Sequence, residues 1–136
     1  MNPLSPFDAN MQLLSKVLDL RAENQKVIGS NIANAETPGY SPARFSFAEE
    51  LSQAINQTGM PLATSHPGHI PLGPRTVGSV TGTILREPDQ TGIGDENGVS
   101  VEEEMLALTE NELLYETSAQ LLKKKLTLMK FVIAGE

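Results

Sequence analysis

The sequence has no cysteine and no tryptophan, and aromatic residues make up only 4% of its 136 residues. Without cysteine the chain can form no disulfide, no cysteine-ligated metal site and no cysteine nucleophile. No hydrophobic run approaches the ~20 residues of a transmembrane helix, so we expect no direct membrane span. Hydrophobic residues amount to 39%, which is low for a chain that must build a large core alone.

Positive charge is scarce as well. The sequence has 10 Lys and Arg against 17 Asp and Glu, which gives a net charge of -7. Because an acidic surface is repelled by phosphate backbones and anionic lipids, we expect no nucleic-acid partner. The first ten residues lack the basic and apolar regions of a cleaved secretory signal. This absence would normally indicate a cytoplasmic protein, but it does not exclude export by a route without a cleaved signal.

Residues 100–136 predict one long C-terminal helix. Ser100 and Glu103 have the spacing of an N-terminal capping box. Apolar residues then recur at alternating gaps of four and three, which is the spacing of a coiled-coil seam. With Glu112 as the one break, the seam consists of Val101, Met105, Leu108, Tyr115, Ala119, Leu122, Leu126, Met129 and Ile133.

A similar seam runs along a first helix that we expect to begin at Ser5-Pro6, where proline is favoured. Its members are Phe7, Met11, Leu14, Leu18, Ile28, Ile32 and Ala35, with Arg21 and Gln25 in the two intervening places. Two seams at opposite ends of one chain predict an antiparallel helical hairpin, a mainly α fold. We expect Phe7 near Ile133, and Arg21 within a turn of Glu112 and Glu116 as a possible ion pair.

The C-terminal helix carries more apolar surface than one partner helix covers. A second row, called the outer stripe below, consists of Leu106, Leu113, Leu114, Leu121, Leu128 and Val132. At ~100° per residue it lies more than a third of a turn from the seam. We expect another chain to cover the outer stripe, since the remaining part of this chain is a poor cover.

That remaining part, residues 36–99, contains seven Pro and nine Gly, a share typical of irregular structure. We expect three parts: an N-terminal helix (1–35), an irregular or small β-containing middle (36–99), and a C-terminal helix (100–136). Short strands are expected around Thr76 to Leu85. The patterning of the middle indicates no second core.

Where the first helix ends, the chain reads Ser30-Asn31-Ile32-Ala33-Asn34-Ala35-Glu36-Thr37-Pro38-Gly39-Tyr40. Pro38 and Gly39 suit the two central positions of a type II turn, and Tyr40 can pack back on the helix. Asn side chains at a helix end bind exposed carbonyls or turn amides.

This run closely resembles the signature of the flagellar rod, hook and hook-associated protein family, in which Asn-x-x-Asn and Thr-Pro-Gly-Tyr follow an amphipathic N-terminal helix. The matching residues are Asn31, Asn34, Thr37, Pro38, Gly39 and Tyr40. The short length and the C-terminal segment from Glu104 to Lys125 are similar to the basal body rod proteins, and to the proximal rod in particular. The resemblance covers both termini, about residues 5–51 and 95–136.

The resemblance implies a structural subunit of the bacterial flagellar basal body. It implies unfolded export by the flagellar type III apparatus, self-association in a helical tube across the periplasm, and contacts with other rod and basal body proteins. In this family a Phe-x-x-x-apolar element is linked to recognition at the export gate, and Phe47 with Leu51 fits that form. The same two residues also fit a short helix, one turn apart.

Other candidate chemistry is weaker. His66 and His69 supply two imidazoles, an incomplete metal site, and the glycine of Asp95-Glu96-Asn97-Gly98 comes too early for a calcium loop. The acids 102–104 suit the positive end of a helix. We therefore expect no catalytic residue, cofactor, metal or small-molecule substrate. The alternatives are another axial rod or hook subunit, or a soluble helical adaptor or chaperone.

Overall fold

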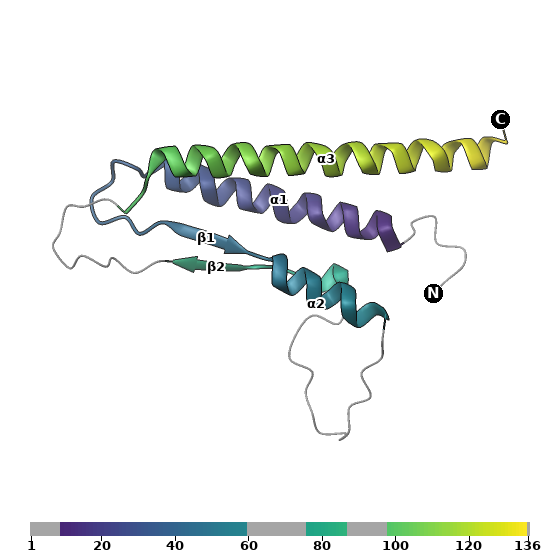
Figure 1. Ribbon diagram of the computed structural model, residues 1–136, viewed down its shortest axis with the longest axis horizontal. Helices are drawn as coiled ribbons and strands as arrows, with labels where there is room; N and C mark the ends of the chain where they lie inside the picture. Colours follow the sequence, from purple (N-terminus) through teal and green to yellow (C-terminus); the bar gives the residue numbers. More distant parts are fainter. Residues whose placement is uncertain (1–8, 60–75, 87–97, 136) are drawn as a thin grey trace, which may run out of the picture.

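The computed structural model of the protein describes residues 9–59, 76–86 and 98–135. Its elements are α1 (Ala9–Ala33), β1 (Ala43–Ser46), α2 (Ala48–Gly59), the 3-10 turn η1 (Val77–Ser79), β2 (Thr83–Arg86) and α3 (Val101–Ala134). In Figure 1, α1 and α3 run side by side in opposite directions, and β1, β2 and α2 lie on the other side of α1. The predicted mainly α fold with two long packed terminal helices and a small β-containing middle is confirmed.

Both ends of α3 follow from local chemistry. The Ser100 hydroxyl caps the first turn by accepting a hydrogen bond from the Glu103 amide at 3.4 Å. Three glutamates in the first turn suit the positive end of the helix dipole. At the other end Gly135 has a φ of 68° and its amide donates to the Phe131 carbonyl, a common glycine C-cap. The predicted start of the C-terminal helix is confirmed.

The two strands pair antiparallel, with Phe45 opposite Ile84. The Glu50 carboxylate on α2 accepts hydrogen bonds from the amides of Thr81 at 3.2 Å and Gly82 at 2.9 Å, which ties α2 to the chain entering β2. Gly82 has a φ of 69°, and a Cβ there would lie 2.4 Å from the Phe45 ring. Only glycine fits this position. The strand expected between Thr76 and Leu85 occupies its second half, and η1 occupies the first.

The middle of the chain does contribute a core, contrary to the prediction. Leu20 of α1 packs with Phe47, Ala54 and Val80 in a buried cluster, against which Phe45, Leu51 and Val77 are partly buried. The sequence does not show this cluster, because Leu20 of α1 meets residues that come one or two at a time from β1, α2, η1 and the residues next to them, none of which gives a long periodic pattern. The cluster covers the side of α1 that faces away from α3.

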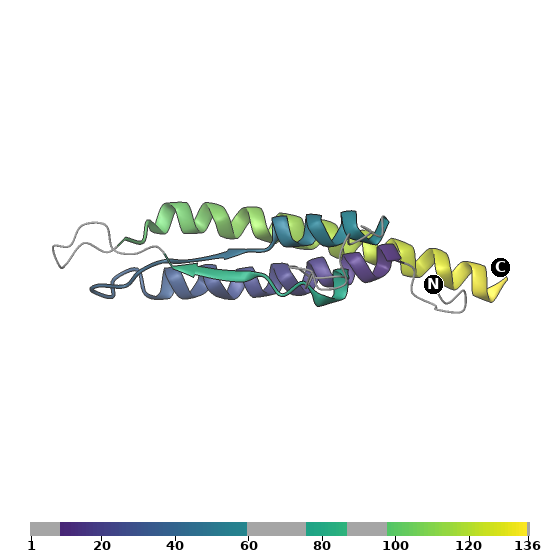
Figure 2. The same cartoon turned by 90° about the horizontal axis from the view of Figure 1, so that it is seen from below.

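The two long helices are not flush at their ends. Met11 lies beside Leu122 and Leu126, so the C-terminal end of α3 extends past Ala9, the first described residue of α1 (Figure 2). The helix start predicted at Ser5, and the expected pairing of Phe7 with Ile133, lie outside the described residues.

Candidate functional site: the junction and the outer face of α3

The chain leaves α1 through a tight turn that its own side chains hold. Gly39 has a φ of 70°, and the Tyr40 amide donates to the Thr37 carbonyl at 3.3 Å, as a type II turn requires. The Asn34 side chain donates to the Ser30 carbonyl at 2.8 Å and accepts from the Thr37 hydroxyl at 3.2 Å. The predicted turn and the predicted role of Asn34 are confirmed.

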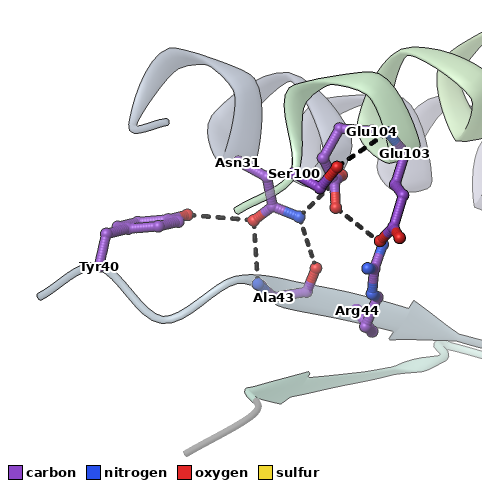
Figure 3. Close-up of polar contacts among 7 residues, drawn as sticks. All are labelled: Asn31, Tyr40, Ala43, Arg44, Ser100, Glu103 and Glu104. Carbon is purple, nitrogen blue, oxygen red and sulfur yellow. Dashed lines mark hydrogen bonds and ion pairs between the residues drawn. The ribbon is translucent and has the colours of Figure 1, made fainter. Parts of the chain in front are cut away.

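Asn31 is the centre of the junction and is fully buried. Its amide nitrogen donates to the Ala43 carbonyl at 2.8 Å and to the Glu104 carboxylate at 3.0 Å. Its amide oxygen accepts from the Ala43 amide at 2.9 Å and from the Tyr40 hydroxyl at 3.2 Å (Figure 3). An Asn side chain has two donors and two acceptor sites, so every one of them is used. A single side chain thus joins α1, the turn, β1 and α3.

Glu104 is the partner of Asn31 on α3, and its side chain is only 1% exposed. One carboxylate oxygen accepts from Asn31, and the other accepts from the Arg44 guanidinium at 2.8 Å. Burying a carboxylate is costly unless it is paired and hydrogen-bonded. Here both oxygens are satisfied, and the first turn of α3 adds its positive dipole.

A second buried polar group lies one heptad further along the helix pair. Asn111 of α3 accepts from Asn24 at 3.0 Å and from Arg21 at 3.4 Å, and its amide donates to the Arg21 carbonyl at 2.9 Å. The Arg21 guanidinium also lies 5.1 Å from the centre of the Phe47 ring. Burial lowers the pKa of Arg21 from its ordinary value, and the charge of Glu110 partly offsets this.

The two polar layers share one spacing. Asn24 and Asn31 are one heptad apart on α1, and Glu104 and Asn111 are one heptad apart on α3. A slip by one turn would leave buried amide and carboxylate groups without partners, which costs more than the hydrogen bonds contribute when formed. Buried polar layers of this kind fix register and direction in paired helices. The layers therefore specify one alignment of α1 and α3.

The outer face of α3 is the opposite of this arrangement, since it is apolar and exposed. Leu106 is 70% exposed, Leu113 64%, Leu128 66% and Val132 83%. Leu114 and Leu121, the other members of the outer stripe, are also exposed. No element in the described part of the chain covers this row. Contiguous exposed apolar surface of this extent is typical of a protein interface.

The sequence of this chain matches known proteins of one family. A family model described as "Flagella basal body rod protein" matches residues 18–40. The flagellar basal body rod protein FlgB of Aeromonas hydrophila is 33% identical over 130 residues, covering 96% of each chain. FlgB of Salmonella typhimurium is 34% identical, covering 97% of this chain and 98% of its own. FlgB of Escherichia coli K12 is 31% identical, covering 96% of each chain.

The chain belongs to the FlgB family of flagellar basal body rod proteins. The residues that match the family model include Arg21, Asn24, Asn31 and Tyr40. The match therefore covers the α1 side of both polar layers together with the turn. In this FlgB-family chain, the motif from Asn31 to Tyr40 that resembles the family signature also contains the centre of the buried hydrogen-bond network at the junction.

Alternate positions of the α3 seam differ from the prediction by one residue. Leu108, Leu122 and Met129 are partly buried, whereas Met105, Tyr115 and Leu126 are exposed by 50%, 37% and 42%, although Leu126 still lies beside Met11 of α1. Glu104 and Asn111 take the buried places that were assigned to Met105 and Glu112. The physical reason is that their hydrogen bonds to Asn31 and Asn24 turn polar side chains inward. Periodicity of apolar residues cannot detect this.

On α1 the predicted seam residues agree better with the residues that are buried. Met11 and Ile28 are buried, and Leu14, Leu18 and Ile32 are partly buried. The prediction missed Leu20 and Val27, which are buried because α1 is covered on a second side by the middle of the chain.

The expected ion pair of Arg21 with Glu112 or Glu116 is not formed. Arg21 bonds to Asn111 instead, and Gln25 is the residue that donates to Glu112, at 3.4 Å. In the described residues no acceptor reaches Arg21 Nε.

Phe47 and Leu51 lie in the folded core rather than on the surface. Phe47 is 8% exposed and packs 5.5 Å from the Phe45 ring, and Leu51 is partly buried against the same cluster. The Leu51 amide donates to the Phe47 carbonyl at 2.9 Å, one turn of helix. The folded chain therefore leaves little of Phe47 and only part of Leu51 exposed.

Sequence reasoning missed Glu104, Arg44 and Asn111 as members of the polar layers. The one signal available was spacing, because Glu104 and Asn111 are themselves one heptad apart. His66, His69 and residues 95–97 lie outside the described residues. Within the described ranges, no group of three metal-ligating side chains gathers, and no helix is long and apolar enough to span a bilayer.

Proposed function

We propose that this FlgB-family chain is a structural subunit of the proximal rod of the flagellar basal body, without catalytic activity, and that neighbouring rod subunits bind its outer stripe. The exposed apolar outer face of α3 is the single observation that carries this proposal. The names of its relatives as basal body rod proteins support the location. Its partners are then other rod and basal body proteins.

The contacts suggest separate roles for the polar layers and the outer stripe. The two polar layers align α1 with α3, so that the terminal helices act as one unit. A rigid helix pair presents its outer stripe in one fixed orientation, which reduces the conformational entropy lost on assembly.

We further propose that the flagellar type III export apparatus recognises Phe47 and Leu51 in the unfolded chain before assembly. The burial of Phe47 and the partial burial of Leu51 in the folded chain support this order of events, because the same side chains would serve the core only after export.

The double substitution Leu121→Asp and Leu128→Asp tests the assembly surface. Both side chains are exposed, at 49% and 66%, so we expect the monomer to fold while rod assembly and motility are lost in a strain that depends on this chain. Secretion of the variant into the medium is expected to persist, measured by immunoblot.

The control is Gln53→Asp with Asn56→Asp, which adds the same charge at exposed positions of α2. We expect near-normal motility from it. Normal rods from the Leu121→Asp, Leu128→Asp variant would show that the outer stripe is not part of the interface.

A further inference from the structure

The two-stranded sheet has an open edge at β2. In Figure 1, β1 lies between α1 and β2, and no element in the described residues lies along the other edge of β2. All four residues of β2 are exposed, and Ile84 and Leu85 are exposed by 53% each. An edge strand with exposed apolar residues is a template for pairing with another strand.

The opposite edge of the sheet is closed by a side chain at Ala43. Asn31 donates to the Ala43 carbonyl at 2.8 Å and accepts from the Ala43 amide at 2.9 Å, so its amide group takes the place of a neighbouring strand. In an antiparallel pair the backbone groups of successive residues point alternately toward and away from the partner strand. Since those of Ala43 point away from β2, those of Arg44 and Ser46 point toward it.

The strand register then identifies the open backbone groups of β2. Leu85 stands opposite Arg44 and Thr83 opposite Ser46, so the amides and carbonyls of Leu85 and Thr83 serve the pairing with β1. Those of Ile84 and Arg86 therefore point to the outer edge. An incoming strand meets one donor and one acceptor on each of these two residues.

Positive charge lies beside this edge. Lys26 of α1 and Arg86 of β2 line a shallow depression of about 180 Å³, together with the apolar side chains of Val27 and Ile84. Lys26 is paired with Glu23, whereas neither ion pair among the described residues includes Arg86. A carboxylate on an added strand would supply the acid that Arg86 does not have in this part of the chain.

We propose that β2 is a docking strand for an extended segment of another protein in which apolar and acidic side chains alternate. The segment adds a third strand to the sheet through the open groups of Ile84 and Arg86. Opposed side chains of paired strands have their Cβ atoms about 4.5–5.5 Å apart, so an acid opposite Arg86 forms an ion pair while an apolar neighbour packs on Leu85. This surface is separate from the outer stripe, so the inference goes beyond the proposed function.

A second copy of this chain is a poorer occupant of the open edge. β2 reads Thr-Ile-Leu-Arg and has no acid. Pairing the β2 strands of two copies would place two positively charged edges against each other with no acid between them, which is unfavourable. An acidic segment forms a charge-assisted hydrogen bond with the guanidinium instead.

The test is binding of a fluorescent heptapeptide to the full-length chain, measured by fluorescence polarization. The probe alternates valine with glutamate. One control peptide carries lysine in place of glutamate, and the other carries N-methyl groups on alternate backbone nitrogens, which removes the donors that face β2. We expect saturable binding of the probe and at least about tenfold weaker binding of both control peptides.

Arg86→Glu tests the charge beside the edge. We expect this variant to bind the glutamate peptide at least about tenfold more weakly than wild type, and to bind the lysine peptide more tightly than wild type does. Lys130→Glu makes the same change at an exposed position of α3 and is the matched control. Its affinity for the glutamate peptide is expected to stay within about twofold of wild type.

Ile84→Pro tests the backbone of the edge. Proline removes the outward amide and is tolerated on an edge strand where the amide faces solvent, so the pairing of β2 with β1 is kept. We expect binding at least about tenfold weaker than wild type, against about threefold for Ile84→Ala, which loses the side chain alone. Circular dichroism and thermal unfolding check that both variants fold.

Four outcomes would overturn the proposal. Equal binding by wild type and Ile84→Pro would show that the peptide binds elsewhere, and equal binding of the glutamate and lysine peptides would show that charge does not select the partner. Absence of binding up to the solubility limit of the probe would remove the site. Self-association of the wild-type chain that Ile84→Pro abolishes would identify a second copy as the occupant.

Hydrogen exchange of the free monomer supplies a further check. Slow exchange of the Ile84 amide without peptide would show that the chain covers its own edge, which also overturns the proposal; fast exchange that the glutamate peptide slows supports it. The Leu121→Asp, Leu128→Asp variant keeps β2 and is expected to bind the peptide as wild type does. Failure of this inference is therefore distinguishable from failure of the proposed function.

Discussion

The inner and outer faces of α3 invert the usual distribution of residues. Glu104 and Asn111 are polar and buried, whereas Leu128 and Val132 are apolar and exposed. The inner residues form hydrogen bonds within this chain, whereas no element in its described part covers the outer ones. The comparison teaches that contacts within the chain fix how its helices align, while apolar surface is kept for contact between chains.

The largest effect is expected from Asn31→Asp, which breaks the inner face. It places a second carboxylate 3.0 Å from that of Glu104 and removes the donor to the Ala43 carbonyl. Uncompensated buried charge costs about 3–5 kcal/mol, a large share of the total stability of a small domain. Denaturant unfolding measures the loss. Asn10→Asp, the same change at an exposed position, is expected to stay within about 0.5 kcal/mol of wild type, and equal stability of both variants would contradict the role of Asn31.

A smaller effect is expected from Glu104→Gln, which keeps the shape of the side chain but removes its charge. The bond to Arg44 becomes weaker and one amide group is left poorly matched, so we expect a loss of about 1–3 kcal/mol in the free energy of unfolding. Glu103→Gln is the neighbouring exposed control, with an expected change of a few tenths of a kcal/mol. If the two variants unfold alike, Glu104 is not a structural anchor.

The smallest effect on the monomer is expected from Val132→Ser, at the exposed end of α3 that extends past the described start of α1. Because Val132 is 83% exposed, its substitution should change the free energy of unfolding by less than about 0.5 kcal/mol. Its effect on self-association should be larger than its effect on folding. Val27→Ser is the buried counterpart, at 8% exposed, and should cost about 1–3 kcal/mol. A clear loss of stability from Val132→Ser would mean that the outer face already has a cover within the chain.

Much of the fold was predictable because long periodic helices and turn chemistry are local signals. The C-terminal helix with its Ser100 cap, the type II turn at Pro38-Gly39, and the exposure of the outer stripe all follow from residues close together in the sequence. The seam was misplaced by one residue because buried Glu104 and Asn111 do not look like core residues. Their burial depends on partners far away in the chain.

The core of the middle segment was missed for a related reason. Phe47 precedes α2, Ala54 lies within it and Val80 follows η1, and all three meet Leu20 on the second side of α1. The Pro and Gly content of the middle segment predicted irregular structure there. It gave no information on whether the irregular parts share a core.

The bond between Asn31 and Glu104 joins positions 73 residues apart, and that between Asn24 and Asn111 joins positions 87 apart. A chain emerging from the ribosome or from a narrow conduit, N-terminus first, therefore cannot satisfy its junction until most of its length is free. The last part to emerge completes the first, because until α3 is available Asn24 and Asn31 lack the partners that stabilise the finished subunit.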